Sequence, residues 1–159
     1  MAGLPGSGKS FFSEMLARRI GAVYLNSDQV RVEMQAGRKY SIEDKLAIYG
    51  RMVELASAAI EAGRDVVVDA TFFHHTLREM FVRLATGYLV PLRVIGITAD
   101  EALVRKRLSR PRRWSEADYG VYEAVRDQFE EIVMPHATLV STDSNIESML
   151  EQAIHYISA

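Results

Sequence analysis

The residues with the clearest capacity for chemistry stand at the start of the chain. Residues 3–10 read G-L-P-G-S-G-K-S and match G-x-x-x-x-G-K-[S/T] at every fixed position. Glycines in such a loop let backbone N–H groups surround phosphate oxygens, and the helix that follows adds the positive end of its dipole. Lys9 is placed to reach the β- and γ-phosphates, and the Ser10 hydroxyl suits Mg²⁺. Ordinary glycine usage makes a chance match less frequent than about one in a hundred chains of this length. The motif predicts a P-loop that binds ATP or GTP.

Two aspartates are the next candidates for chemistry. Asp28 follows a short predicted strand, residues 22–26, and Asp69 follows Val66–Val68, an apolar run typical of a buried parallel strand. Ligands bind at the carboxyl ends of strands in open α/β sheets. Asp69 therefore suits a carboxylate that holds Mg²⁺ directly or through water. Asp28 could accept the proton of an acceptor hydroxyl, or it could instead cap a helix beginning near Gln29.

A basic stretch follows a predicted helix later in the chain. Arg105 and Lys106 are best interpreted as a solvated helix face, whereas Arg110 and its neighbours up to residue 113 surround Pro111 and indicate a loop. Arginines that close over phosphates would neutralise the charge that develops during phosphoryl transfer. A nucleic-acid patch is the alternative, but the cluster is small and has few aromatic neighbours. The pattern favours a phosphate-contacting loop.

Other catalytic and metal chemistries find little support. The chain has no cysteine, which excludes disulfides, thiolate metal sites and a cysteine nucleophile. His74 and His75 are adjacent, but no H-E-x-x-H or comparable spacing supplies the further ligands that a metal requires. We interpret these histidines as loop or substrate-pocket residues.

Hydrophobic periodicity predicts the elements that position these residues. Apolar residues at helical spacing and continuous apolar runs alternate along the chain, the pattern of an α/β domain with a parallel sheet and helices on both faces. The predicted helices are Lys9–Ile20 (ending at Gly21), Ser41 to about Gly63, Thr76–Thr86, Glu101–Leu108, Glu116–Val133 and Ile146–Ile157. The predicted strands are Ala22–Asn26, Val66–Val68, Leu92–Ile97 and Ala137–Val140.

One element is missing from this pattern. A P-loop normally leaves a buried strand, yet only Met1 and Ala2 precede Gly3. A parallel sheet without an interior strand would leave backbone groups unpaired. We therefore expect about five further apolar residues before Met1 in the natural protein. Otherwise direct pairing of two strands, a neighbouring molecule or a rearranged sheet must close the gap.

The composition limits the classes of protein to which the chain can belong. The chain has 159 residues, of which 48% are hydrophobic and 25% charged, and these values fit one globular domain. A formal net charge of −2 gives no overall attraction to nucleic acid or to an anionic membrane. No apolar run reaches the ~20 residues needed to span a bilayer, and no signal peptide is recognisable. We expect a cytoplasmic protein.

Three segments in this order resemble one family. They are G-L-P-G-S-G-K-S, then L-N-S-D-Q-V-R at Leu25–Arg31, then V-V-V-D-A-T at Val66–Thr71. Together they resemble the P-loop kinases described as predicted ATP-binding kinases, which are related to the kinase domain of polynucleotide kinase and to zeta toxins. The resemblance covers nearly the whole chain and implies a single three-layer domain over residues 1–159. Its sheet order would be 2-3-1-4-5, with the first, central strand largely absent.

The resemblance also implies roles for matching residues. Asp28 would be the general base, with Lys9 and Arg110 as the other catalytic residues. Arg110 is the best match to a phosphate-contacting arginine in a lid at about 109–115, and Arg107 is the next. Acceptor-side residues would be Arg31, Asp69 and Thr71, and Mg²⁺ would bind at Ser10 and Asp69. The expected nucleotide-binding set is Gly3, Pro5, Gly6, Ser7, Gly8, Lys9, Ser10, Phe11 and Arg107.

These expectations lead to a functional hypothesis. The protein would transfer the γ-phosphoryl group of ATP to a hydroxyl acceptor, with Mg²⁺. A nucleotide-binding regulatory module or weak NTPase is the main alternative, and a kinase for nucleic-acid 5′-hydroxyls is a less favoured third. The acceptor pocket would be built from residues 30–40 and 72–78, whose mixture of basic and aromatic residues fits a nucleoside, sugar, antibiotic or oligonucleotide end equally well.

Overall fold

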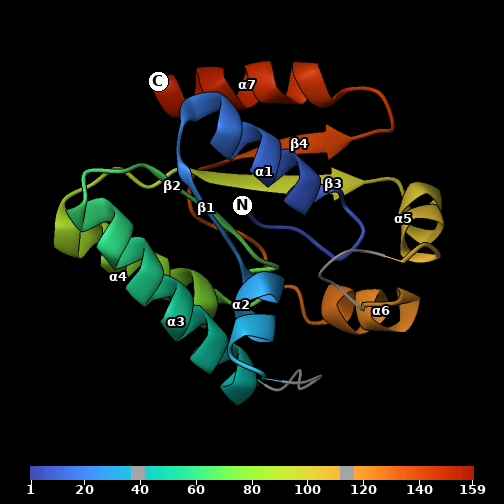
Figure 1. The fold of residues 1–159 in the computed structure, drawn as a ribbon. Helices are drawn as coiled ribbons and strands as arrows, with labels where there is room; N and C mark the ends of the chain where they lie inside the picture. The colour runs from blue at the N-terminus through green and yellow to red at the C-terminus, as the bar shows by residue number, and fades with distance from the viewer. Residues whose placement is uncertain (37–41, 112–116) are drawn as a thin grey trace.

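Parallel strands alternate with helices along the chain, as the sequence predicts (Figure 1). The computed structural model describes residues 1–36, 42–111 and 117–159. The strands are β1 (Val23–Asn26), β2 (Val66–Asp69), β3 (Val94–Ala99) and β4 (His136–Ser141). The helices are α1 (Lys9–Ile20), α2 (Ser27–Glu33), α3 (Ile42–Glu61), α4 (His75–Tyr88), α5 (Glu101–Leu108), α6 (Tyr119–Asp127) and α7 (Ile146–Ser158).

The strands pair in two parallel ladders. β1 pairs with β2 in a register that sets Val23 beside Val66 and Asn26 beside Asp69. β3 pairs with β4 from Val94 to Ala99. This register brings the carboxyl ends of β1 and β2 to the same edge, where the polar residues of the predicted site stand.

Residues 1–3 connect the two ladders. The Met1 ammonium donates to the Val68 carbonyl of β2 (2.7 Å), and the Met1 carbonyl accepts from Ala70 (3.3 Å). On the other side, Ala2 forms a parallel bridge with Gly96 of β3. Direct pairing of β2 with β3 is therefore not how the gap is closed. The order 2-3-1-4-5 stays a prediction, because these three residues form an isolated bridge and not a strand.

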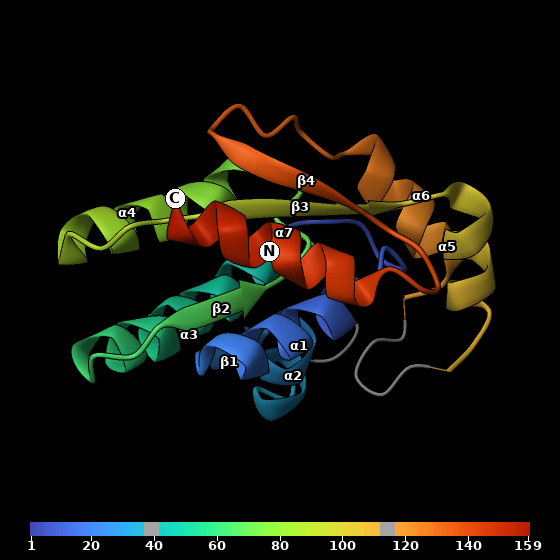
Figure 2. The same cartoon turned by 90° about the horizontal axis from the view of Figure 1, so that it is seen from above.

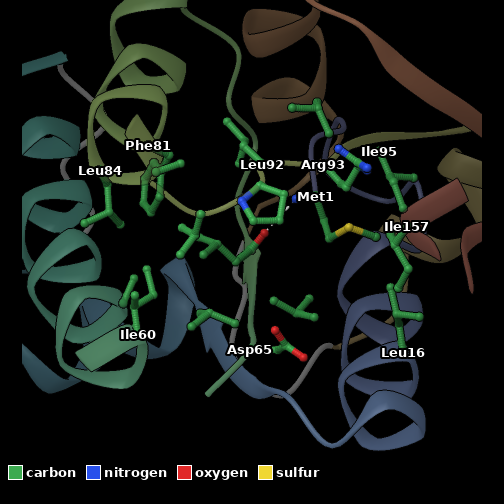
Figure 3. Close-up of a pocket in the computed structure, with 18 of the residues that line it drawn as sticks. Met1, Leu16, Ile60, Asp65, Phe81, Leu84, Leu92, Arg93, Ile95 and Ile157 are labelled. Atoms are coloured by element: carbon green, nitrogen blue, oxygen red, sulfur yellow. Dashed lines mark hydrogen bonds between the residues drawn. The ribbon is translucent and has the colours of Figure 1, made fainter. Parts of the chain in front are cut away.

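A cavity of about 700 Å³ lies beyond Met1, on the side away from the P-loop. Val66–Val68 and Val94–Ile95 line it, so it separates the two strands that residues 1–3 bridge. Figure 3 shows Leu16, Phe81 and Ile157 around it, on α1, α4 and α7. The expectation of further apolar residues before Met1 concerns this space and stays a prediction.

Two apolar cores hold the helices against the strands. The first packs α3 and α4 with residues of β1 and β2, and Met52 and Leu77 at its centre are fully buried. The second packs α1 and α7 with β3 and β4 around Phe12 and Leu150. Figure 2 shows α7 and α1 running side by side. Among the described residues, no helix is long and apolar enough to cross a membrane.

Most predicted bounds agree with the structure to within two residues, and two elements show a systematic difference. The predicted strand Leu92–Ile97 is displaced to Val94–Ala99, because the ladder with β4 continues to the Ala99–Ser141 pair. The predicted helix Glu116–Val133 ends at Asp127. Past that point Glu130 donates its N–H to the Phe73 carbonyl. Tertiary hydrogen bonds therefore replace the helical ones. The predicted N-cap Ser41 lies outside the described residues.

Candidate nucleotide and acceptor site

The glycine-rich loop precedes α1 and has the backbone of an anion cradle. Gly8 is the N-cap of α1 with φ of 90°, and no side chain caps this helix. The first-turn N–H groups are thus left for an anion. Gly3 has φ of 155°, and a Cβ there would lie 2.5 Å from the Ile97 carbonyl oxygen. Lys9 is half-buried at the first position of α1, whereas Phe11 is mostly exposed.

Arg107 on α5 supports this loop. Its guanidinium donates to the Gly6 and Ser7 carbonyls (3.4 and 3.2 Å) and to the Thr142 carbonyl after β4 (3.0 Å). These bonds hold the backbone of the loop at Gly6 and Ser7. The predicted direct contact of Arg107 with nucleotide stays a prediction.

A polar cluster occupies the carboxyl ends of β1 and β2. Asp69 is fully buried. Its Oδ2 accepts from the Asn26 amide (2.5 Å) and from the Tyr24 hydroxyl (2.8 Å). The Asn26 amide also lies 3.5 Å from the Ser10 hydroxyl. The two predicted Mg²⁺ ligands, Ser10 and Asp69, are thus joined by the side chain of Asn26.

The second carboxylate oxygen of Asp69 has no hydrogen-bond partner among the described residues, although it is buried. A buried carboxylate oxygen without a donor is costly unless a cation or water satisfies it. Oxygen ligands are what Mg²⁺ requires, and it is usually held by one or two protein groups together with phosphates. Ser10 and Asp69 therefore fit a magnesium site.

Tyr24 and Asn26 were not identified from the sequence as site residues. They stand two apart on β1, so both side chains point to the same face of the sheet. Burial, reinforced by the charge of Asp69, raises the pKa of the Tyr24 hydroxyl well above its usual value. Tyr24 therefore remains a proton donor to Asp69. Alternation along β1 could have suggested the pair, but the register with β2 was needed to connect it to Asp69.

Asp28 lies at the start of α2 but does not cap it. The Asn26 side-chain oxygen accepts from the N–H groups of Asp28 (2.9 Å) and Gln29 (3.1 Å), so Asn26 is the N-cap and the predicted alternative role of Asp28 is wrong. The half-buried Asp28 carboxylate forms no hydrogen bond or ion pair with a described residue. Its predicted role as a general base stays a prediction.

A second group of residues faces α2 from α3 and from the loop after β2. The Tyr49 hydroxyl accepts from the Phe72 N–H (3.1 Å) and lies 3.4 Å from the Thr71 hydroxyl. Burial is the main cause that raises the pKa of Tyr49 to about 12, and the carboxylates of Asp69 and Asp28 add to it. Tyr49 thus contacts Thr71 and is affected by the charge of Asp28. The predicted acceptor role of Thr71 stays a prediction.

Arg110 lies on the exposed surface just after α5. Its charge contributes to the lowered pKa of Asp143, a smaller cause than the hydrogen bond from Lys106. The predicted lid at 109–115 falls mainly on residues 112–116, outside the described part of the chain. Its role, and that of Arg110, stay predictions.

His74 and His75 both lie against the Glu130 carboxylate, at 3.2 Å from His74 Nε2 and 2.8 Å from His75 Nδ1. Their predicted place in a substrate pocket stays a prediction. The Nδ1 atom of His74 accepts from the Thr76 N–H (3.2 Å) and so caps α4. The proton of this ring must therefore be on Nε2, which faces Glu130 at 3.2 Å. The Arg78 guanidinium lies 3.7 Å from the same carboxylate. Because an Nδ1 atom that accepts a hydrogen bond leaves His74 neutral, His74 ties the start of α4 to Glu130 by a hydrogen bond.

Comparison with known proteins places this geometry in a family. A family model described as AAA domain matches residues 1–132. No curated protein matches the sequence. Among solved structures, the Mycobacterium tuberculosis APS kinase has a TM-score of 0.78 at 18% identity, covering 99% of this chain and 95% of that one.

Two further structures share the fold. A gluconokinase from Sinorhizobium meliloti 1021 has a TM-score of 0.75 at 16% identity, covering 99% of this chain and 89% of that one. Chaetomium thermophilum Kti12, in complex with ADP-AlF3, has a TM-score of 0.74 at 14% identity, with 99% and 97% covered. The chain therefore belongs to the AAA domain family, and its α/β fold is that of the P-loop kinases.

Proposed function

We propose that the protein transfers the γ-phosphoryl group of ATP to a hydroxyl group of an acceptor. The observation that carries this proposal is the position of Asn26. Its side chain holds the N–H of Asp28 on one side and the Asp69 carboxylate on the other, beside Ser10. One amide thus sets a candidate base next to a candidate metal site, which is the arrangement that phosphoryl transfer to a hydroxyl needs.

The phosphates of ATP would bind the loop that Arg107 supports. Backbone N–H groups at the start of α1 and the Lys9 ammonium would hold them. Mg²⁺ held by Ser10 and Asp69 would neutralise charge on the β- and γ-phosphates. Tyr24 and Asn26 would keep Asp69 in place, because both donate to its Oδ2.

Asp28 would act on the acceptor. As the acceptor oxygen attacks the γ-phosphorus, its proton would pass to the Asp28 carboxylate while the bond from phosphorus to the β-bridging oxygen breaks and ADP leaves. A nucleotide switch has no evident use for a carboxylate at this place, whereas an NTPase could use it to activate water. The fold likeness to an APS kinase solved with AMPPNP and APS adds support for a small-molecule acceptor.

A screen of metabolite pools tests the proposal. Purified protein, ATP and Mg²⁺ are incubated with the pool, and products 80 Da heavier than their precursors are sought by mass spectrometry. Lys9→Ala is the negative control. ATP hydrolysis that is independent of every pool, with no phosphorylated product, would favour the weak NTPase instead.

A further inference from the structure

Lys45 is a buried lysine in the first turn of α3. Only 6% of it is exposed, and its ammonium lies 3.9 Å from the centroid of the Phe73 ring. In the described part of the chain, no carboxylate or carbonyl oxygen pairs with this ammonium. A buried charge is costly without a partner, and a cation–π contact compensates only part of that cost. Among the described residues, the ammonium therefore has no anionic group in direct contact.

The charges around Lys45 come from α2. Arg31 adds a second positive charge and Asp28 a single negative one, and both act on Lys45. Burial is the main cause that lowers the pKa of Lys45, to about 8, so the ammonium remains mostly charged at neutral pH. Lys45 and Arg31 are thus two cations near the carboxylate of Asp28, the candidate base. The helices α2 and α3 pack against each other here, so these groups share one region.

We propose that the acceptor carries an oxyanion group, a phosphate, sulfate or carboxylate, and that Lys45 and Arg31 bind it while the acceptor hydroxyl faces Asp28. This inference rests on the proposed function, because it assigns the substrate class of the same site. The oxyanion would supply the missing charge partner of Lys45 by charge-assisted hydrogen bonds. The Phe73 ring would keep the ammonium oriented.

A purely structural role for Lys45 makes a different prediction. If the lysine only anchors α3 on Phe73, Lys45→Met would cost packing alone and would leave ligand binding unchanged. If it is an anion subsite, Lys45→Met would preserve or raise the melting temperature, because a buried charge is removed. At the same time it would weaken anion binding. Lys106→Met is the matched control, because Lys106 is an exposed lysine on α5.

The first test is direct binding of sulfate. Protein saturated with AMPPNP and Mg²⁺, so that the P-loop is filled, is titrated with sodium sulfate by calorimetry at constant ionic strength. We expect one sulfate per chain in the parent protein and in Lys106→Met. In Lys45→Met binding should be about tenfold weaker or more, as for loss of a hydrogen bond to a charged group. The inference would be overturned if the AMPPNP-saturated parent protein bound no sulfate. It would also be overturned if Lys45→Met bound sulfate with the same affinity as the parent.

The second test separates this inference from the proposed function. Pairs of hydroxyl compounds that differ only in an anionic group, such as sugars and their phosphate esters or sugar acids, are offered with ATP. The anionic member of a pair should be phosphorylated with kcat/KM at least about tenfold higher, and Lys45→Met should abolish that preference. Equal use of neutral and anionic members would refute the anion subsite and leave phosphotransfer standing. If no compound is phosphorylated, phosphotransfer fails, and the sulfate titration alone decides on the subsite.

Discussion

The side-chain amide of Asn26 bridges two carboxylate residues, because its nitrogen donates to Asp69 Oδ2 at 2.5 Å while its oxygen accepts from the Asp28 N–H at 2.9 Å. The amide is planar and rigid, so the two contacts are geometrically linked. Any movement of α2 relative to β2 must therefore disturb either the cap of α2 or the environment of Asp69.

Replacing this amide by a carboxylate is expected to separate its two functions. Asn26→Asp retains an oxygen that can cap α2, but it sets a second carboxylate against Asp69. Like charges this close disfavour double ionisation. We expect the free energy of unfolding at pH 7 to fall by about 1–3 kcal/mol, measured by urea denaturation. A loss that disappears at pH 4, where the pair can share a proton, would support this cause; an equal loss at both pH values would contradict it.

Removing the Tyr24 hydroxyl should weaken the metal site. Tyr24→Phe leaves Asp69 Oδ2 with the Asn26 amide as its remaining described donor. The carboxylate would be less firmly held, so we expect a higher Mg²⁺ requirement and a stability loss of about 1 kcal/mol. Activity is measured against Mg²⁺ concentration at saturating ATP. Tyr156→Phe is the control, because that hydroxyl makes only a 3.5 Å contact near the surface. An unchanged Mg²⁺ dependence would disprove the positioning role.

Neutralising Asp28 should affect chemistry far more than nucleotide binding. Asp28→Asn is expected to reduce phosphoryl transfer by ~10²–10⁴, the usual contribution of a general base. ATP affinity should remain near the parent value, because the P-loop is built from other residues. Transfer rates and nucleotide binding are measured on the same preparation, with the exposed Asp127→Asn as control. Transfer at the parent rate would show that Asp28 is not the base.

Anion binding at Lys45 should depend on pH in a defined direction. The folded protein holds this lysine at a pKa of about 8, below the ordinary 10.5. An anion favours the charged form, so sulfate affinity of the AMPPNP-bound protein should be constant below pH 8 and fall above it. Sulfate itself does not titrate in this range. In Lys45→Met this decrease should be absent.

The same shift has a consequence for stability. Between about pH 8 and 10.5 the unfolded chain binds more protons at Lys45 than the folded chain does. Its contribution to the free energy of unfolding therefore rises with pH across this window, and it is least favourable below pH 8. Chemical denaturation of the parent protein at pH 7.5 and 9.5, compared with Lys45→Met, checks the sign. A steeper rise in the variant than in the parent would contradict it.

An apolar extension before Met1 should stabilise the fold. The cavity of about 700 Å³ separates β2 from β3, and the Met1 ammonium is buried beside it with its pKa lowered to about 6, mainly by burial. Five added β-branched residues could pair with both strands, fill the cavity and remove the buried amine. We expect a higher melting temperature and tighter ATP binding. A Gly-Ser extension of equal length is the control. Equal melting temperatures for the parent, the β-branched extension and the Gly-Ser extension would show that a strand in the cavity does not stabilise the fold.

The parts of this protein that the sequence determined are those with local causes. The P-loop is eight consecutive residues, and α1 begins and ends at glycines because their backbones adopt positive φ at Gly8 and Gly21. The α/β class follows from strands and helices that alternate over short distances. Asp28 and Asp69 were found because each lies at the carboxyl end of its own predicted strand.

Contacts between distant residues were decided only by the tertiary structure. Asn26 and Asp69 are 43 positions apart and meet through strand register, whereas Arg107 reaches the Gly6 carbonyl across 101 positions. α6 ends earlier than predicted because the segment after it forms hydrogen bonds with the loop after β2 and with α4. Helical periodicity in the sequence cannot reveal such long-range hydrogen bonds. No motif marks Lys45 in the sequence, because the burial of a side chain depends on which elements pack over it. In the folded chain it is buried with its ammonium over the Phe73 ring, which makes it a candidate ligand-binding residue.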